Sequence, residues 1–207
     1  MEEAVRLYQT AHRLMDTSSG GTRLTEAAGH MRRAADMGHP AAANNFGAML
    51  QYGRGVAPDL ALARKYYALA AEKGLAAGAF NLGFMLREGL GGEADAAAAR
   101  KLFVVAAMAW DADAMTHLGV MCMTGEGGPQ DFRSARKWWR KGAKTGNKQC
   151  AFNLGVACAG GHGEPPDFVA AHRWFLLAER LGNASAREEL EKLEAVMSRE
   201  ERDHAKN

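Results

Sequence analysis

The sequence predicts an all-α solenoid of helix–turn–helix repeats, and three observations carry that prediction. Glycines recur every 36 residues, aspartates recur in the same register, and a large apolar or aromatic pair follows each aspartate at a fixed distance. Because one helical hairpin cannot bury its apolar face alone, neighbouring repeats must stack. The two series are Gly47, Gly83, Gly119 and Gly155, and Asp59, Asp95, Asp131 and Asp167.

The register divides the chain into five repeats and a C-terminal extension, which we expect to form a single solenoid domain. Ala11, Ala27 and Gly38 occupy repeat positions, so residues 1–38 are interpreted as a degenerate repeat with its turn at Thr17–Gly21. The four full repeats are predicted at 39–74, 75–110, 111–146 and 147–182, and capping helices at 183–207.

The first helix of each repeat is expected to begin at a capping residue and to present small side chains to its partner. Asp111, Asn147 and Asn183 are good N-caps, because their side chains accept hydrogen bonds from orphan backbone N–H groups. Small residues lie four apart on one face, as Ala43 and Gly47 do. Small side chains there let the second helix approach closely.

The second helix of each repeat follows a glycine turn. Paired glycines such as Gly53 and Gly55 are predicted to form the turn, since glycine adopts positive φ at no steric cost. The recurring aspartate then caps the second helix. We expect this helix to bury its recurring alanines and the whole large apolar pair: Tyr66-Tyr67, Leu102-Phe103, Trp138-Trp139 and Trp174-Phe175.

The C-terminal extension is predicted to form a lid, that is, helices that cover the last repeat with an apolar face and present a polar face to solvent. Ala186, Leu190, Leu193 and Met197 form an apolar stripe at helical spacing. The segment Ser198–Glu201 matches a capping box, which predicts a second short helix. A repeat array needs such a lid to keep its last apolar face from solvent.

Composition limits the function classes. With 26 basic and 24 acidic side chains, the charge gives no reason to expect nucleic-acid binding. No apolar run approaches the ~20 residues that membrane insertion needs, and the acidic N-terminus does not resemble a signal peptide. Three cysteines, Cys122, Cys150 and Cys158, suit a reducing compartment. We therefore predict a cytoplasmic protein without a cofactor, provided that the chain has lost no leader peptide.

About a dozen positions recur in all four full repeats, and the last repeat shows them best. It contains Ala151-Phe152-Asn153-Leu154-Gly155, Gly161-x-Gly163, Asp167, Ala171, Trp174-Phe175 and Gly182. This pattern resembles the SEL-one-like repeat (SLR) family, a branch of the tetratricopeptide-like α-solenoids. The resemblance implies a right-handed superhelix whose members mostly act as adaptors. The sequence departs from the pattern at Trp110, where glycine is expected, and at His117, where asparagine is expected.

The resemblance also implies a binding surface, because the first helices of tetratricopeptide-like solenoids line a concave groove. The candidate partner-binding residues are Asn45, Phe80, Asn81, Phe84, Arg87, Thr116, His117, Val120, Met123, Phe152, Asn153 and Val156. The apolar ones would form a strip that binds an apolar peptide or helix. The alternative is that they pack between adjacent first helices, and the sequence leaves both interpretations open.

The row Asn45, Asn81, His117 and Asn153 has two interpretations as well. An amide donates and accepts hydrogen bonds, so the row could hold the backbone of an extended peptide. Relatives with different partners share this asparagine, however. A structural hydrogen bond to the preceding repeat is therefore the favoured interpretation.

Two catalytic or metal-binding patterns are set aside. Ser134-Ala135-Arg136-Lys137 and Lys144-Thr145-Gly146 match two motifs of penicillin-recognising enzymes, but they share one helix and its end and lack the third motif. Cys158 and His162 are four residues apart, yet Cys158 occupies a core position, so no metal site is expected.

The sequence therefore favours a non-enzymatic adaptor that binds a protein or peptide in a concave groove. One rival is a β-lactam-binding or β-lactam-hydrolysing enzyme, as suggested for some cysteine-rich members of the resembled family. A second rival is a structural module of a larger assembly. The sequence predicts no oligomeric state.

Overall fold

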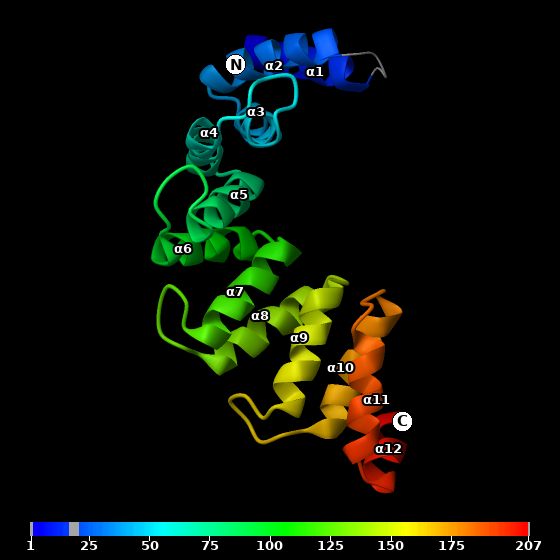
Figure 1. Ribbon diagram of the computed structural model, residues 1–207. Helices are drawn as coiled ribbons and strands as arrows, with labels where there is room; N and C mark the ends of the chain where they lie inside the picture. The colour runs from blue at the N-terminus through cyan, green and yellow to red at the C-terminus, as the bar shows by residue number, and fades with distance from the viewer. Residues whose placement is uncertain (1, 17–20, 207) are drawn as a thin grey trace. The chain divides into compact units, whose positions relative to one another are not determined.

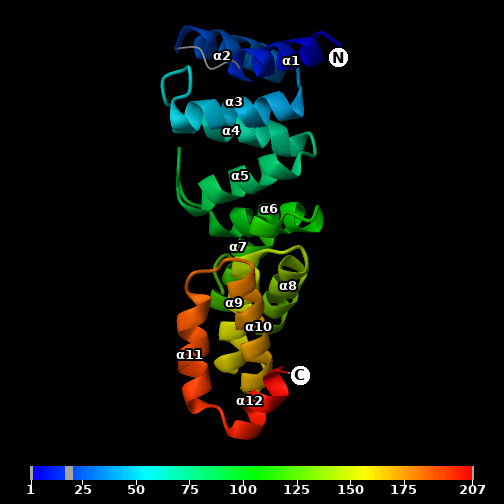
Figure 2. The same ribbon diagram turned by 90° about the vertical axis from the view of Figure 1, so that its right-hand side faces the viewer.

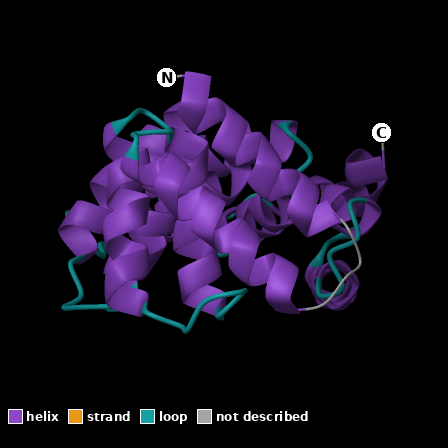
Figure 3. Cartoon of the chain, turned by 90° about the horizontal axis from the view of Figure 1, so that it is seen from above, coloured by secondary structure: helices purple, strands orange, loops and turns teal. Residues whose placement is uncertain are grey.

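The computed structural model describes residues 2–16 and 21–206. Within these ranges the chain forms twelve α-helices and no β-strand. Figure 3 draws the helices in purple and the loops that join them in teal. The predicted all-α fold class is confirmed. Residues 17–20 of the turn expected at Thr17–Gly21 lie outside the described residues. The helices form two compact units, Met1–Ala106 and Ala107–Asn207. That the whole chain is one solenoid domain stays a prediction.

The first unit is built from stacked helical hairpins. Helix α1 pairs with α2 and α3 pairs with α4, while α2 packs on α3 and α4 packs on α5 (Figure 1). Each hairpin therefore covers the apolar face of the next one, as the repeat pattern requires. The helices are α1 (Glu2–Asp16), α2 (Gly21–Asp36), α3 (Pro40–Tyr52), α4 (Leu60–Glu72), α5 (Ala76–Arg87) and α6 (Ala96–Met108), which ends just inside the second unit.

The second unit repeats this plan and adds the lid. Helix α7 pairs with α8, α8 packs on α9, and α9 pairs with α10. The last two helices, α11 and α12, both pack on α10, beside which they lie in Figure 2. The helices are α7 (Ala112–Thr124), α8 (Phe132–Lys144), α9 (Lys148–Ala159), α10 (Phe168–Arg180), α11 (Ala186–Val196) and α12 (Arg199–Lys206).

The predicted helix caps are nearly all present. All four recurring aspartates accept a hydrogen bond from the backbone N–H three residues later, at 2.8–2.9 Å. Asp111 and Asn147 cap α7 and α9 in the same way. The expected cap at Asn183 was wrong, because its side chain accepts from the N–H of Ser185 and forms a local turn instead. Helix α11 begins only at Ala186.

The close approach of the two helices in each repeat is confirmed. The second member of each large apolar pair lies directly on the recurring glycine: Tyr67 on Gly47, Phe103 on Gly83, Trp139 on Gly119 and Phe175 on Gly155. These four side chains are buried, but the first members Leu102, Trp138 and Trp174 are only half-buried. The prediction that the whole pair is buried was wrong in these three repeats, because the side chains of consecutive helical residues point about 100° apart.

The lid also forms as predicted. Leu190, Leu193 and Met197 are buried against the last repeat. Ser198 and Glu201 exchange the two hydrogen bonds of a capping box, at 2.7 and 3.2 Å. No helix within the described ranges combines the length and the apolar character that crossing a membrane requires.

Candidate functional site

The predicted groove residues share one environment. All twelve lie on the first helices of their repeats, α3, α5, α7 and α9, and none is fully buried. Val156 is the most accessible, with 41% of its surface exposed. The other eleven are half-buried, so these residues lie at the edge of the core. That a partner binds them stays a prediction.

Four of these residues surround a small apolar hollow between α7 and α9. Its volume is about 140 Å³. The first helices contribute Val120, Met123, Asn153, Val156 and Ala157, while Trp139 comes from α8 and His162 from the loop after α9.

The Trp139 side chain, which forms one wall of this hollow, is held by close packing and by a hydrogen bond. The indole lies on Gly119, where a Cβ atom would have no room. Its Nε1–H donates a hydrogen bond of 3.2 Å to the carbonyl oxygen of Thr116. The only polar atom of the indole is therefore satisfied, and the ring offers the hollow an apolar surface. The hydroxyl of Thr116 lies within hydrogen-bonding distance of the carbonyl oxygen of Ala112, the side-chain oxygen of Asn147 and the thiol of Cys150.

Two polar side chains line the hollow. The side-chain carbonyl of Asn153 accepts a hydrogen bond from Gln149 at 3.0 Å. Its amide nitrogen donates no hydrogen bond to any residue that the structure describes, and it is not sealed from solvent. The ring of His162 stacks on Phe132, with centroids 5.7 Å apart. The hollow thus combines apolar walls with polar side chains at its edge, including the available amide N–H of Asn153.

The first unit has a hollow at the same place in its repeat. Its volume is about 220 Å³. Its lining residues Met15, Asn45, Ala48, Met49 and Arg54 lie three 36-residue periods before Met123, Asn153, Val156, Ala157 and His162. The backbone of the repeat therefore forms the hollow, and the side chains give each copy its own chemistry.

The aromatic groove residues are partly packed inside their own repeats. Phe80 lies 5.7 Å from Phe103, and Phe152 lies 5.6 Å from Phe175, measured between ring centroids. Each ring thus leans on the second helix of its hairpin while remaining half-buried. The two rings belong to different units. One continuous apolar strip across the chain therefore stays a prediction.

The asparagine row is partly structural, as the favoured interpretation expected. Asn81 donates a hydrogen bond of 2.8 Å to Asn44 in the preceding repeat. Asn45 lies 3.3 Å from the ring nitrogen Nε2 of His12, again one repeat earlier. Asn153 differs, since its side chain accepts a hydrogen bond from Gln149 on its own helix. Only Asn153 of these three amides therefore combines a place in an apolar hollow with an available donor.

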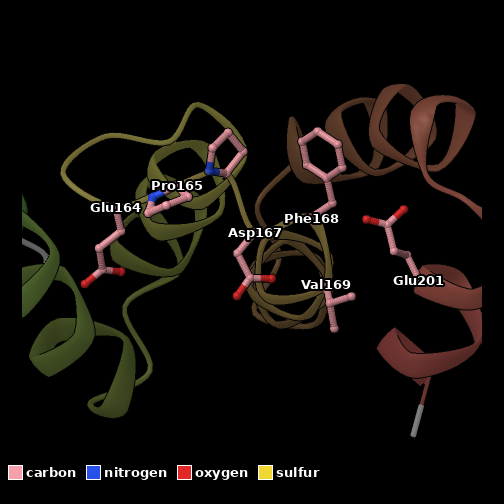
Figure 4. A pocket seen from close by; sticks show the side chains of 7 residues that line it. Glu164, Pro165, Asp167, Phe168, Val169 and Glu201 are labelled. Atoms are coloured by element: carbon pink, nitrogen blue, oxygen red, sulfur yellow. The ribbon is translucent and has the colours of Figure 1, made fainter.

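A larger hollow of about 510 Å³ lies between the turn before α10 and helix α12 (Figure 4). The sequence did not indicate it. Its carboxylates are already engaged: Glu164 with Arg136 at 2.9 Å, Asp167 as the cap of α10, and Glu201 in the capping box. They hold the local fold together, so they do not form a ready site for a cation.

The motifs set aside have structural roles where the structure shows them. Ser134 lies in the first turn of α8, and Thr145 caps the C-terminal end of that helix. Cys158 is buried and accepts a hydrogen bond from Arg136 at 3.2 Å. Burial raises the pKa of the Cys158 thiol, and it raises that of Cys150 to about 11. Among the described residues, no group of three or more His, Cys, Asp or Glu side chains could hold a metal ion.

Sequence comparison identifies repeats of one family along most of the chain. The model of the Sel1 repeat matches residues 19–39, 40–75, 76–109, 112–147 and 148–183. The last four matches begin one residue after the predicted starts at 39, 75, 111 and 147. Among curated proteins, none matches the chain.

Several solved structures share the fold. A protective antigen of uropathogenic Escherichia coli with an SLR fold superposes with a TM-score of 0.85 at 25% identity, over 96% of this chain and 44% of its own. A Sel1 repeat protein from Oxalobacter formigenes gives a TM-score of 0.80 at 26% identity, over 90% and 72%. An immunity protein from Pseudomonas aeruginosa, at 19% identity and a TM-score of 0.54 over 90% and 69%, shows the fold alone. This chain thus spans less than half the length of the E. coli antigen.

Proposed function

Because the chain belongs to the Sel1 repeat family, we propose that it is a non-enzymatic adaptor that binds a segment of another protein on its first helices. Sel1 repeats generally mediate protein interactions. The observation that carries the proposal is the apolar hollow between α7 and α9, which has an accessible valine at its edge and an available amide donor beside it.

The size of the hollow favours a peptide side chain over a small-molecule substrate. Pockets for drug-sized ligands and cofactors have volumes of roughly 300–1,000 Å³, whereas this one has about 140 Å³. One apolar anchor side chain of a partner would fit that volume. Such anchors supply most of the binding energy in many interfaces, because they are fully desolvated.

The chemistry around the hollow indicates what the bound segment looks like. Val120, Met123 and Val156 would contact a leucine, isoleucine or methionine of the partner. The amide of Asn153 would donate a hydrogen bond to a backbone carbonyl next to that anchor. We expect the adaptor to work in a reducing compartment such as the cytoplasm, since its three cysteines are buried and unpaired.

Selection of peptides from a random display library against the purified chain tests this proposal. Selected peptides should share an apolar anchor, and their affinity should fall at least about tenfold for Val156→Asp and Val120→Asp, because a buried carboxylate would meet the anchor. Helicity and cooperative unfolding of both variants should be retained.

The matched control is Val196→Asp. Val196 lies on α11 and is 67% exposed, so the same substitution there should leave peptide affinity unchanged. The proposal is wrong if selected peptides bind both hollow variants as tightly as they bind the original chain.

A further inference from the structure

Helix α8 has the highest net positive charge of the described helices. It contains six arginines and lysines and no acidic residue. Four of them, Arg133, Lys137, Arg140 and Lys144, are spaced four, three and four residues apart, which places them on one helix face. All four are exposed, whereas Trp139 on the opposite face is buried. They form a basic stripe about 16 Å long at a rise of about 1.5 Å per residue.

The repeat architecture accounts for only part of this stripe, because the position of Lys137 is basic in every full repeat, as Lys65, Lys101 and Arg173 show. At the positions of Arg133, Arg140 and Lys141, the other three full repeats carry only alanine, valine or leucine. The helix dipole stabilises a cation in the last turn, such as Lys144, but it destabilises a cation in the first turn, such as Arg133. Like charges four residues apart on a helix also repel each other.

Among the described residues, no carboxylate forms an ion pair with Arg133, Lys137, Arg140 or Lys144. The buried Arg136 is different, since it is paired with Glu164 at 2.9 Å. The stripe is therefore available for carboxylates from outside the chain.

An exposed tryptophan lies beside the stripe. The ammonium of Lys141 is 4.8 Å from the ring centre of Trp138 and 5.9 Å from that of Trp110. Trp110 is 63% exposed and has a φ of +66°, at a repeat position where Gly74, Gly146 and Gly182 have φ of 81–84°. It thus combines a strained backbone with an apolar ring in solvent, and glycine would avoid both.

We propose that the basic stripe of α8 and Trp110 form a second docking surface, for an acidic helical segment of a partner protein. Glutamates or aspartates at i, i+4, i+7 and i+11 of the partner would match the stripe, and an apolar side chain of the partner would cover Trp110. This surface uses the exposed face of α8, whereas the proposed peptide site uses α7, α9 and the buried face of α8.

A protein segment fits this surface better than a nucleic acid. The stripe is short, and the chain as a whole has a formal charge of only +2. The lid helix α11 of the same unit carries Glu188, Glu189, Glu191 and Glu194. A nucleic-acid backbone would extend past the stripe onto a near-neutral surface, where its phosphates would gain no attraction. A short acidic segment needs basic groups only within about 8–10 Å of its own carboxylates, the distance over which salt screens charges.

Fluorescence anisotropy with a synthetic acidic helical peptide of about 16 residues tests the proposal. The peptide has glutamates four, three and four residues apart and one leucine, and it should bind the full chain with an affinity that weakens as salt rises from about 50 to about 200 mM. Arg133→Glu/Arg140→Glu should weaken binding at least about tenfold, and Trp110→Gly should weaken it several-fold. Neither change should lower the melting temperature, since each removes a repulsion or a strain.

The matched control is Lys65→Glu/Lys101→Glu, which makes the same charge change at exposed positions of α4 and α6. It should bind the peptide like the original chain. Three outcomes overturn the proposal: no peptide binding at low salt, equal loss in the control, or tighter binding of a single-stranded oligonucleotide of matching charge. Peptides selected for the α7/α9 hollow should still bind the charge-reversed variant, so the two proposals can fail separately.

Discussion

The indole nitrogen of Trp139 lies 3.2 Å from the carbonyl oxygen of Thr116 and donates a hydrogen bond to it. This bond joins α8 to α7 and holds the ring that lines the hollow between α7 and α9. The ring can reach this position only because residue 119 is a glycine. The proposed peptide site therefore depends on Gly119, which does not itself line the hollow.

Gly119→Ala should destabilise the protein and close the hollow. The added Cβ would overlap the Trp139 indole, which its hydrogen bond to Thr116 holds against Gly119, so the free energy of unfolding should fall by about 1–3 kcal/mol. Denaturant unfolding measures this. Gly29→Ala is the control, since a Cβ there meets nothing within 4 Å, and it should raise stability by about 0.5–1 kcal/mol. Equal effects of both changes would contradict the packing argument.

Trp110→Gly should stabilise the fold. Removing a non-glycine side chain from the left-handed region relieves roughly 1 kcal/mol, partly offset by the lost contact with Lys141. Thermal unfolding should show a higher melting temperature. The reverse change at an equivalent position, Gly146→Ala at φ +84°, should lower it. A lower melting temperature for Trp110→Gly would mean that the contacts of the Trp110 ring stabilise the fold by more than its positive φ destabilises it.

Asn81→Ala should lower stability without affecting the α7/α9 peptide site. It leaves the Asn44 carbonyl without the 2.8 Å hydrogen bond that it accepts, at a cost of about 1 kcal/mol. The double variant Asn44→Ala/Asn81→Ala should cost less than the two single changes together, because the two amides share one interaction. Strict additivity would show that they act independently, and lost affinity for selected peptides would show a direct binding role.

Stability should fall at alkaline pH, in part through Cys150. Burial raises the pKa of this thiol from about 9 to about 11 in the folded protein. A raised folded-state pKa means that the stabilisation is complete below about pH 9 and is lost as the pH rises through about 11. Burial raises the pKa of Tyr66 and Tyr67 as well, so the decline continues beyond that window.

Cys150→Ala isolates the thiol contribution. Two other full repeats carry alanine at this position, Ala42 and Ala114, so the repeat tolerates it. The variant should show a flatter decline in unfolding free energy between about pH 9 and about pH 11. An unchanged pH profile would show that Cys150 does not titrate in this range.

Much of the fold was predictable because it rests on local chemistry repeated in register. An aspartate before a helix accepts the same N–H bond in each of the four full repeats, and glycine adopts positive φ in each turn. The misplaced cap at Asn183 arose where the repeat ends, since a local turn competes there with the helix. The candidate site was predictable only as a set of helix positions, because groove residues were inferred from helix rotation alone.

The sequence alone therefore determined the all-α repeat, its 36-residue register, most of the helix caps and the lid, since each depends on neighbours within a few residues or one period. It did not determine which groove residues gather around a hollow. Tertiary structure decided that: Phe80 and Phe152 lean on their own second helices, whereas Val156 stays exposed. The physical reason is that a side chain's contacts depend on its rotamer and on the helix packed opposite, which a periodic pattern does not specify.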